Sequence, residues 1–308
     1  MFKVPAQDFS LAATLECGQT FRWQRRQGAY YGFLSARRTS HGPLGRSYAV
    51  KVTQAGSTLT VDTADPALRA EDIQRYFALD IDLDRVLQTI DVDAQIHEAI
   101  GRYRGLRVLR QDPWECLASF ICSSYNNIKR IQGMIERLCE AYGAPLAYNG
   151  FRGCAFPAPE AIANATERRL RALGLGFRAS YLKATARLVA DGKLSLETLR
   201  RTDYRVSKSA LLRCEGVGEK VADCVALFGL EKYEAFPVDV WIERAARYYF
   251  RQATMTPTRI HEFAWRHFGR YAGYAQQYLY HYVRNLRPAA SDQRPAINKG
   301  DVSSTLSV

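Results

Sequence analysis

The chain has 308 residues, of which 47% are hydrophobic, so it can bury a sizeable core in two or three domains. It carries 43 Lys and Arg against 31 Asp and Glu, a formal net charge of +12. No stretch approaches the roughly 18 consecutive apolar residues of a membrane helix, and the first ten residues, MFKVPAQDFS, lack the apolar centre of a signal peptide. These features argue against a membrane or secreted protein, and the charge favours a polyanionic partner such as nucleic acid.

The sequence contains seven cysteines and no C-x-x-C pair. Several lie at apolar positions of helical segments, as in ECLASFIC, which is typical of reduced, buried thiols. A zinc site or an iron–sulfur cluster needs a ligand spacing that is not found in this sequence. We therefore expect a reducing compartment: the cytoplasm, in association with the nucleoid, in a bacterium, or the nucleus in a eukaryote.

The first hundred or so residues combine β-type segments with helices. Residues 48–53 and 58–62 have alternating β-branched side chains and flank QAGS at 54–57, a pattern that predicts an antiparallel hairpin. The basic stretch RRTSHGPLGR at 37–46 is typical of an exposed loop. Asp65-Pro66 predicts the start of a helix, because aspartate caps helices and proline is accepted in their first turn.

From Asp112 onwards the sequence predicts one helix after another. Asp112-Pro113 is a second start signal, YNN at 125–127 interrupts the helical period, and Gly143 ends the next helix. Further helices are expected at 166–173, 179–190, 207–213, 219–228, from 239 and at about 271–285. The predicted fold class is α+β and mainly helical, with an N-terminal antiparallel β-domain at 1–105, a helical domain at 106–287 with which N-terminal residues can pack, and a polar, disordered tail at 288–308.

The most informative segment is LLRCEGVGEKVADC at 211–224, part of a helical hairpin at about 207–230. Glycines at 216 and 218 permit positive φ and remove side chains from the turn. The N–H groups at the start of the second helix then point outward, where partial positive charge and unpaired donors suit a DNA phosphate. Contacts at Gly216 and Gly218 would read no base and would be independent of sequence. An ordinary helix–helix turn is the alternative.

Lys220 falls in the first turn of this second helix, and Asp239 follows in FPVDVW at a position typical of a helix N-cap. A cation is electrostatically unfavourable at a helix start, which favours the neutral amine that forms Schiff bases. One helix and one loop separate the two residues, a spacing that can fold both groups into one cleft. A phosphate-binding surface lysine and a purely capping aspartate are the simpler alternatives.

GVGEKVADC and FPVDVW together resemble the helix-hairpin-helix/Gly-Pro-Asp superfamily of DNA glycosylases. The segments that are similar to its 8-oxoguanine DNA glycosylase branch are CGQTFRW (17–23), DPWECLASFICSS (112–124), NNIKRI (126–131), LGLGFR (173–178) and AGYAQQYLY (272–280). Their order and spacing agree from about residue 8 to residue 287. The resemblance implies a β-domain followed by two helical subdomains with the active site between them. It also implies a bifunctional enzyme that excises 8-oxoguanine and then nicks the strand by β-elimination.

The resemblance further implies roles for individual residues. Lys220 would attack C1′ of the damaged nucleotide and form a Schiff base, while Asp239 would stabilise the charge that develops there. The backbone carbonyl of Gly18 would accept the N7 hydrogen that 8-oxoguanine has and guanine lacks. The other residues assigned to the flipped base are Gln276 at its Watson–Crick edge, Cys224 and Tyr280 at its faces, and Pro237.

Residues outside this pocket would contact the DNA and the base opposite the lesion. The positions assigned to these contacts are Tyr125, Asn126, Arg130, Phe177, Arg178, Gly216, Gly218 and Trp241. Arg130 and Arg178 match arginines that contact the orphaned cytosine, and Phe177 matches an aromatic wedge. Tyr125 departs from the family's animal members, which have there an asparagine that enters the gap left by the flipped base, so strict selectivity for cytosine is not expected. Trp241 stands where many members have a histidine that contacts phosphate.

No cofactor or catalytic metal is expected. The resemblance implies at most a structural monovalent cation at hairpin carbonyls such as those of Cys214 and Val217. The expected partner is double-stranded DNA containing 8-oxoguanine, bound by a monomer. Two alternatives stay open: a related hairpin glycosylase for another damaged base, and a DNA-binding hairpin module without catalysis. The sequence has no cysteine after Cys224, which argues against relatives with a C-terminal four-cysteine cluster.

Overall fold

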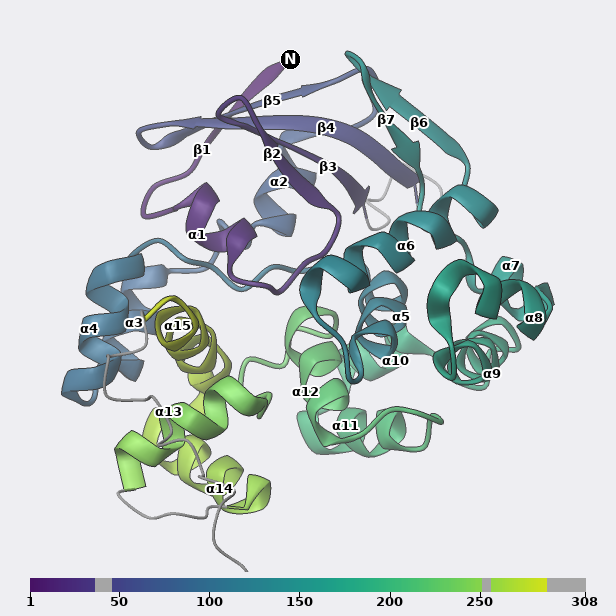
Figure 1. Cartoon of the computed structure of the whole chain (residues 1–308). Helices are drawn as coiled ribbons and strands as arrows, with labels where there is room; N and C mark the ends of the chain where they lie inside the picture. Colours follow the sequence, from purple (N-terminus) through teal and green to yellow (C-terminus); the bar gives the residue numbers. More distant parts are fainter. Residues whose placement is uncertain (37–45, 251–255, 287–308) are drawn as a thin grey trace, which may run out of the picture.

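The computed structural model of the chain describes residues 1–36, 46–250 and 256–286 (Figure 1). The basic loop predicted at 37–46, except Arg46, and the tail predicted at 288–308 lie outside the described residues. The structure is mainly helical with an antiparallel sheet at its N-terminal part, so the predicted α+β class is confirmed. None of the described helices combines the length and the apolar character needed to cross a membrane.

The sheet lies along one side of the molecule and has five antiparallel strands in the order β1-β5-β4-β3-β2 (Figure 1). Its strands are β1 (Phe2–Pro5), β2 (Trp23–Arg26), β3 (Ala29–Ala36), β4 (Arg46–Ala55) and β5 (Thr58–Thr63). Strands β4 and β5 form the hairpin predicted around residues 54–57. Val50 and Val52 are fully buried and Lys51 between them is not, as the two-residue period of a strand requires.

Helices build most of the remaining described chain. The first are α1 (Leu11–Glu16), α2 (Ala70–Tyr76), α3 (Leu83–Ile90) and α4 (Ala94–Tyr103). A central group comprises α5 (Pro113–Ser123), α6 (Ile128–Tyr142), α7 (Pro159–Asn164), α8 (Glu167–Leu170), η1 (Arg171–Leu175), α9 (Arg178–Ala190), α10 (Leu196–Arg201), α11 (Tyr204–Leu212) and α12 (Glu219–Phe228). The last group comprises α13 (Val240–Phe250), α14 (Pro257–Phe268), η2 (Gly269–Tyr271) and α15 (Ala272–Asn285). A two-stranded hairpin, β6 (Pro145–Tyr148) and β7 (Phe151–Cys154), follows α6.

Side-chain caps confirm the predicted helix start at Asp112 and correct the one at Asp65. The Asp112 carboxylate accepts a hydrogen bond from the Glu115 N–H (2.9 Å) and Pro113 opens α5. The Asp65 carboxylate instead accepts from the Ala67 N–H (2.9 Å) in a turn, and α2 begins only at Ala70. Aspartate before proline favours such a turn as well as a helix, so the local signal did not decide between them.

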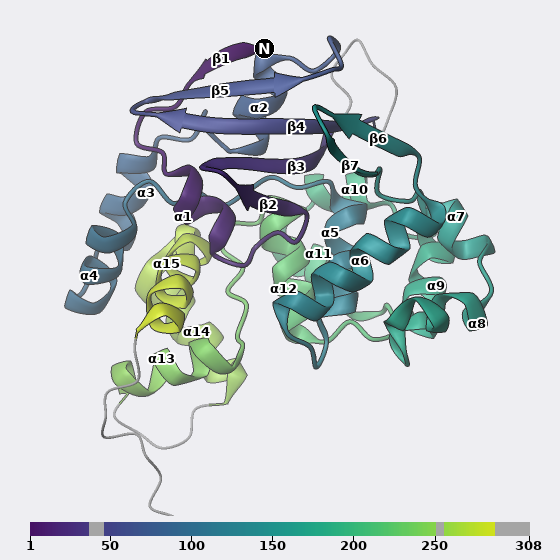
Figure 2. The same ribbon diagram turned by 45° about the horizontal axis from the view of Figure 1, so that its top comes forward.

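Two hydrophobic cores hold the structure together. The smaller one packs the sheet against α1 and α2 through residues such as Trp23 and Phe77. The larger one runs through the helices and includes α3 and α4, which lie beside α15 in both views (Figures 1 and 2). Cys17 and Phe21, from the loop after α1, join the larger core, and the Phe21 ring lies 5.4 Å from that of Phe120 on α5. This segment near the N-terminus therefore packs among helices that lie much later in the sequence.

Candidate active site

The α11–α12 hairpin presents an open helix start. Gly216 has φ +76°, and a Cβ there would lie 2.3 Å from the ring of Tyr181, so conformation and close approach both require glycine. Gly218 has φ −90° and does not use the freedom predicted for it. It is the N-cap of α12 and supplies no side-chain cap to the helix. The first N–H groups of α12 can therefore receive an anion such as phosphate.

Lys220 lies in the first turn of α12 and is half-buried. Its Nζ donates to Ser123 Oγ at 3.4 Å and lies 5.1 Å from the centre of the Phe120 ring. Both partners belong to α5, which forms the facing wall. A hydrogen bond of this length is weak, so little free energy is lost when the Lys220 amine leaves Ser123 and turns to a substrate.

Asp239 caps α13, as predicted. Its Oδ1 accepts hydrogen bonds from the N–H groups of Trp241 (3.1 Å) and Ile242 (3.0 Å). Burial raises the pKa of this carboxyl, while the Ile242 N–H and the nearby Lys220 oppose the rise. Capping leaves the carboxylate charge in place, so the capping role and an electrostatic role in the cleft are compatible.

One small cavity gathers the residues predicted for catalysis and base binding. Its volume is about 50 Å³. It is lined by Gly18, Phe120, Lys220, Cys224, Phe228, Pro237, Asp239, Gln276, Gln277 and Tyr280. All seven predicted catalytic and base-binding residues are in this lining, and they come from four separate segments of the chain. A DNA-binding hairpin without catalysis has no reason to gather them.

Two buried side chains give the cavity its chemical character. Gln276 is 4% exposed, and its Oε1 has no hydrogen-bond partner among the described residues. Because an unpaired buried acceptor is unfavourable, this oxygen favours a bound N–H donor. Burial raises the pKa of the Cys224 thiol to about 12, against the opposing effect of Lys220. Cys224 therefore packs as a small neutral group and is not a second nucleophile.

Two buried glutamines that were not predicted hold the loop around Gly18. The Gln277 side chain donates to the carbonyl of Cys17 (3.0 Å). The Gln19 amide makes three hydrogen bonds of 2.8–2.9 Å to the backbone of Thr14, Arg107 and Leu109. These bonds fix the direction of the peptide groups beside Gly18, whose φ is +84°. Their only signal in the sequence was a run of amides, CGQ and QQ, inside apolar segments.

A wider cleft of about 1280 Å³ opens from the cavity. The predicted DNA-contacting residues in its lining are Tyr125, Asn126, Phe177, Gly216, Gly218 and Trp241. Tyr125 is 97% exposed and has φ +50°, and Phe177 is 45% exposed. Exposed large aromatic side chains beside a cleft are typical of a surface that a partner covers.

The two arginines predicted to contact the opposite base are not among the described residues that line the cleft. Arg178 is buried, and its guanidinium donates to the carbonyls of Ser124 (2.9 Å from Nε) and Tyr125 (3.3 Å from Nη2). The same group lies 4.4 Å from the centre of the Phe177 ring. In this structure Arg178 holds the Tyr125 turn and the Phe177 ring in place, and a base contact would break these bonds. Arg130 is exposed on α6.

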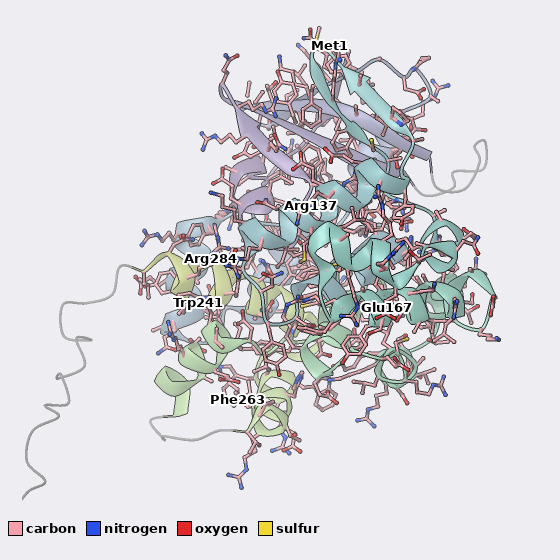
Figure 3. The ribbon with its side chains drawn as sticks, turned by 45° about the vertical axis from the view of Figure 1, so that its right-hand side comes forward. Met1, Arg137, Glu167, Trp241, Phe263 and Arg284 are labelled. Carbon is pink, nitrogen blue, oxygen red and sulfur yellow. The ribbon has the colours of Figure 1, made fainter. Side chains whose placement is uncertain are left out.

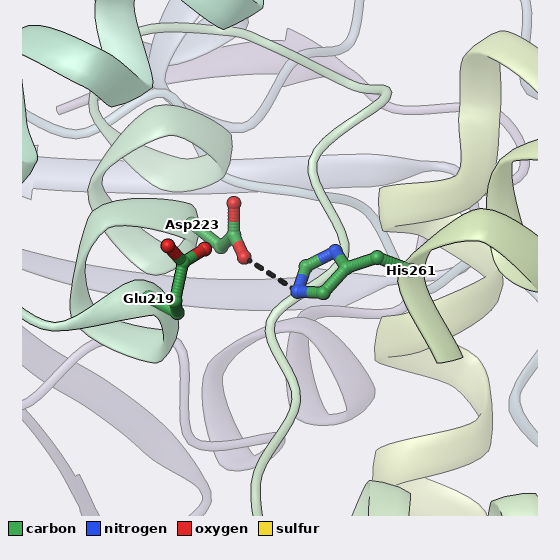
Figure 4. Close-up of side chains that lie close together, drawn as sticks. All are labelled: Glu219, Asp223 and His261. Carbon is green, nitrogen blue, oxygen red and sulfur yellow. Dashed lines mark ion pairs between the residues drawn. The ribbon is translucent and has the colours of Figure 1, made fainter. Parts of the chain in front are cut away.

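An ion cluster is centred on the buried Asp223 of α12, which faces Glu219 and His261 (Figure 4). The fully buried Asp223 carboxylate contacts the Tyr204 hydroxyl (2.5 Å), Lys208 Nζ (3.0 Å) and His261 Nε2 (3.0 Å). Lys208 also lies 2.7 Å from Glu219. Glu219, Asp223 and His261 have the ligand types of a metal site, but the Lys208 ammonium already supplies positive charge to both carboxylates. The cluster is therefore an ionic bridge that ties α12 to α11 and α14.

Comparisons with known proteins identify the family. Two family models match: the N-terminal domain of 8-oxoguanine DNA glycosylase over residues 1–117, and HhH-GPD superfamily base excision DNA repair protein over residues 118–270. A probable N-glycosylase/DNA lyase of Methanothermobacter thermautotrophicus is 30% identical, with 92% of this chain and 96% of the relative covered.

Two solved structures are similar over nearly the whole chain. MBOgg1 in complex with a low-affinity DNA ligand has a TM-score of 0.84 at 35% identity, with 92% of this chain and 94% of that chain covered. The Clostridium acetobutylicum 8-oxoguanine glycosylase/lyase, bound to DNA containing cytosine opposite to 8-oxoG, has a TM-score of 0.83 at 31% identity, with 92% and 98% covered. The chain thus belongs to the 8-oxoguanine DNA glycosylase family, within the HhH-GPD superfamily of base excision DNA repair proteins.

Proposed function

We propose that the protein excises 8-oxoguanine from duplex DNA and then cleaves the strand at the resulting site. The observation that carries this proposal is the convergence of Lys220 and Asp239 with Gly18, Cys224 and Gln276 around one cavity, next to a helix start open to phosphate. The likeness to N-glycosylase/DNA lyases supports the same activity.

The first step releases the damaged base. The nucleotide rotates out of the duplex into the cleft, because its C1′ cannot be reached inside the stack. As the bond between C1′ and the base breaks, positive charge develops on the sugar, and the Asp239 carboxylate stabilises it. The neutral Lys220 amine adds to C1′, and the proton that it loses is taken up by the leaving base. The ring oxygen then leaves C1′ and takes up the second proton of the amine, which gives an imine on Lys220.

The second step cleaves the strand. The imine makes a hydrogen on C2′ acidic, and loss of this proton breaks the bond between C3′ and its phosphate oxygen. The strand is nicked on the 3′ side of the lesion, and water hydrolyses the imine to restore the Lys220 amine. The reaction needs no redox partner, because every bond that breaks does so heterolytically: the base, the ring oxygen and the 3′ phosphate each leave with the electron pair of the bond to carbon.

Recognition of the lesion rests on a few hydrogen-bonding groups. The Gly18 carbonyl accepts the N7–H of 8-oxoguanine, whereas guanine presents a lone pair there that repels it. The unpaired Gln276 Oε1 accepts an N–H from the Watson–Crick edge. The cavity of about 50 Å³ is much smaller than the roughly 150 Å³ of an engineered protein cavity that binds benzene, and a purine is larger than benzene. Its walls must therefore separate when the base enters.

We propose double-stranded DNA as the partner of a monomeric protein, acting in the bacterial cytoplasm or in a nucleus. A monovalent cation would brace the hairpin and take no part in the chemistry. The Cys214 carbonyl accepts the Val217 N–H (3.1 Å) inside the hairpin turn, and a carbonyl oxygen has a second lone pair for such an ion.

The decisive experiment is single-turnover incubation with duplexes that carry 8-oxoguanine opposite each of the four bases, with an undamaged guanine duplex as the control. We expect base release and a nicked strand from the damaged duplexes alone, and a covalent adduct when borohydride is present. Binding without release from any damaged duplex would favour a hairpin module. A further duplex that carries an alkylated base tests the other alternative, because release from this duplex in place of 8-oxoguanine release would favour a related glycosylase.

A further inference from the structure

Arg284 is a cation at the mouth of the active site that takes no part in the proposed reaction. It lies on α15 and lines the wide cleft, as does Trp241 on α13; both are labelled in Figure 3. Its guanidinium carbon lies 5.8 Å from the centre of the Tyr280 ring. A Cβ on Gly18 would come within 3.1 Å of Arg284 Nη1, so glycine at this position makes room for the guanidinium.

The Arg284 guanidinium opposes the rise in pKa that burial causes at Tyr280, but one of its nitrogens is buried without a hydrogen bond to the described part of the chain. Arg284 Nη1 has no hydrogen-bond partner among the residues that the structure describes. A guanidinium stays charged at every accessible pH, and it offers five N–H donors in a plane. A buried donor without an acceptor is unfavourable, so this arrangement favours an incoming anion.

The order of side chains along α15 indicates which anion. Gln276, Tyr280 and Arg284 follow one another in steps of four residues and so lie along one side of the helix. At a rise of 1.5 Å per residue they span about 12 Å, from the depth of the cavity to its mouth. A flipped nucleotide presents a base edge, a base face and a phosphate in the same order.

We propose that Arg284 binds the phosphate adjoining the flipped nucleotide and thereby retains that nucleotide in the pocket. The inference rests on the proposed function, because it requires a nucleotide that leaves the duplex. Arginine forms paired hydrogen bonds to two phosphate oxygens, and this geometry is available only once the backbone turns into the cleft. Arg284 therefore contributes to binding of the extruded state and not to general attraction of DNA.

The test compares a duplex that contains a tetrahydrofuran abasic-site analogue with an undamaged duplex. The analogue has no base to excise and no aldehyde to trap, so binding is measured apart from activity. Arg284→Ala should lower the slope of log Kd against log salt by about 0.9 on the analogue duplex, the value of one lost phosphate contact. The slope on the undamaged duplex should not change. Arg284→Lys retains the charge and should restore most of the slope.

Arg102 on α4 provides a matched control, since its guanidinium also lies beside a tyrosine ring, 5.9 Å from the centre of Tyr103, outside the cleft lining. Arg102→Ala should leave both slopes unchanged. An unchanged slope for Arg284→Ala on the analogue duplex would overturn the inference, as would an equal fall on both duplexes. Failure of the proposed function is a separate outcome, because it appears as absence of 8-oxoguanine release in the wild type whatever the salt slopes are.

Discussion

The base pocket and the rim of the cleft hold their side chains in opposite ways. In the pocket, Cys224 and Gln276 are only 3% and 4% exposed, and the backbone near Gly18 is fixed by buried amides. At the rim, Tyr125 is 97% exposed, and its place is set by hydrogen bonds from Arg178 to backbone carbonyls. Packing thus constrains the identity of the pocket residues, whereas a rim held through its backbone accepts different side chains. The chemistry should be insensitive to the rim, and tolerance of the opposite base should depend on it.

The largest effect is expected for Lys220→Gln, which tests whether the pocket alone carries the chemistry. Loss of the nucleophile should lower single-turnover excision roughly 1,000-fold or more and abolish the borohydride adduct. The control is Lys129→Gln, because Lys129 is an exposed lysine in the same cleft lining. It should trap normally. A Lys220→Gln protein that still forms the adduct would move the nucleophile elsewhere.

Asp239→Asn should slow base release by about 100- to 1,000-fold, the usual cost of removing an electrostatic partner of the transition state. Asparagine caps helices as well as aspartate does, so the α13 cap should survive and DNA binding should change little. Loss of binding with unchanged single-turnover release would instead mean that Asp239 only caps the helix.

The same variant has a pH signature. Burial raises the pKa of Asp239, so the folded protein binds this proton more tightly than the unfolded chain does. The stability contributed by the protonated carboxyl is therefore lost as the pH rises through the unfolded and then the folded pKa. Excision by the wild type should fall on acidification at a higher pH than an ordinary aspartate would give. Asp239→Asn should lack this acid limb and should have a higher Tm at neutral pH.

An intermediate effect is expected at the contact between Asp223 and His261, which holds helix α12 against helix α14. His261→Leu breaks the contact between Asp223 on α12 and the helix α14 that follows Asp239, and it should slow excision tenfold to about 100-fold by misplacing Lys220. His261→Gln can still donate to Asp223 and should recover most of the rate.

The control for this bridge is His267→Leu on the same helix, which breaks a 2.7 Å contact with Asp93 away from the cleft. It should lower Tm without slowing excision at permissive temperature. Equal slowing by the two leucine variants, or no recovery with glutamine, would reduce the Asp223 bridge to a general stabilising contact.

The same contrast explains how far the sequence alone could predict the site. The placement of Lys220 and Cys224 on one helix face was predictable because their four-residue spacing is local, and the cap at Asp239 because capping is a local signal, whereas the role of Cys224 in base binding was implied by the family resemblance. The Asp223–His261 bridge joins residues on separate helices, and no local pattern encodes that contact. Arg178 was matched to a base-contacting position, but the shape of the 124–125 turn, which decides where its guanidinium points, is known only from the structure.

In the fold, too, features set by local signals were predictable and contacts between distant segments were not. Helix α12 was predicted at its observed bounds, since glycine and apolar period mark both ends. The start at Asp65 was wrong, because a turn and a helix share the same first residues. The packing of α3 and α4 beside α15 depends on contacts between distant segments, which the helical period of each segment does not specify.

The smallest effect is expected at Tyr125, where the rim meets the orphaned base. Stacking on one base is worth about 1–3 kcal/mol, and the lower figure suits a side chain that is 97% exposed, so Tyr125→Ala should weaken binding about fivefold, to a similar degree for each of the four opposite bases. Tyr125→Phe keeps the ring and should bind like the wild type. Tyr125→Asn suits the backbone, since φ is +50° and asparagine adopts this region readily.

In Tyr125→Asn, the aromatic ring that can stack on any base is replaced by an amide. The donors and acceptors of the amide pair only with particular base edges. The excision ratio for cytosine over adenine opposite the lesion should therefore rise a few-fold, at little cost in maximal rate. If Tyr125→Ala weakened binding to the cytosine duplex alone, the exposed tyrosine would itself be reading that base. Selectivity for the opposite base would then depend on the identity of a rim residue. The contrast between a constrained pocket and a permissive rim would fail at Tyr125, the most exposed aromatic residue of the rim.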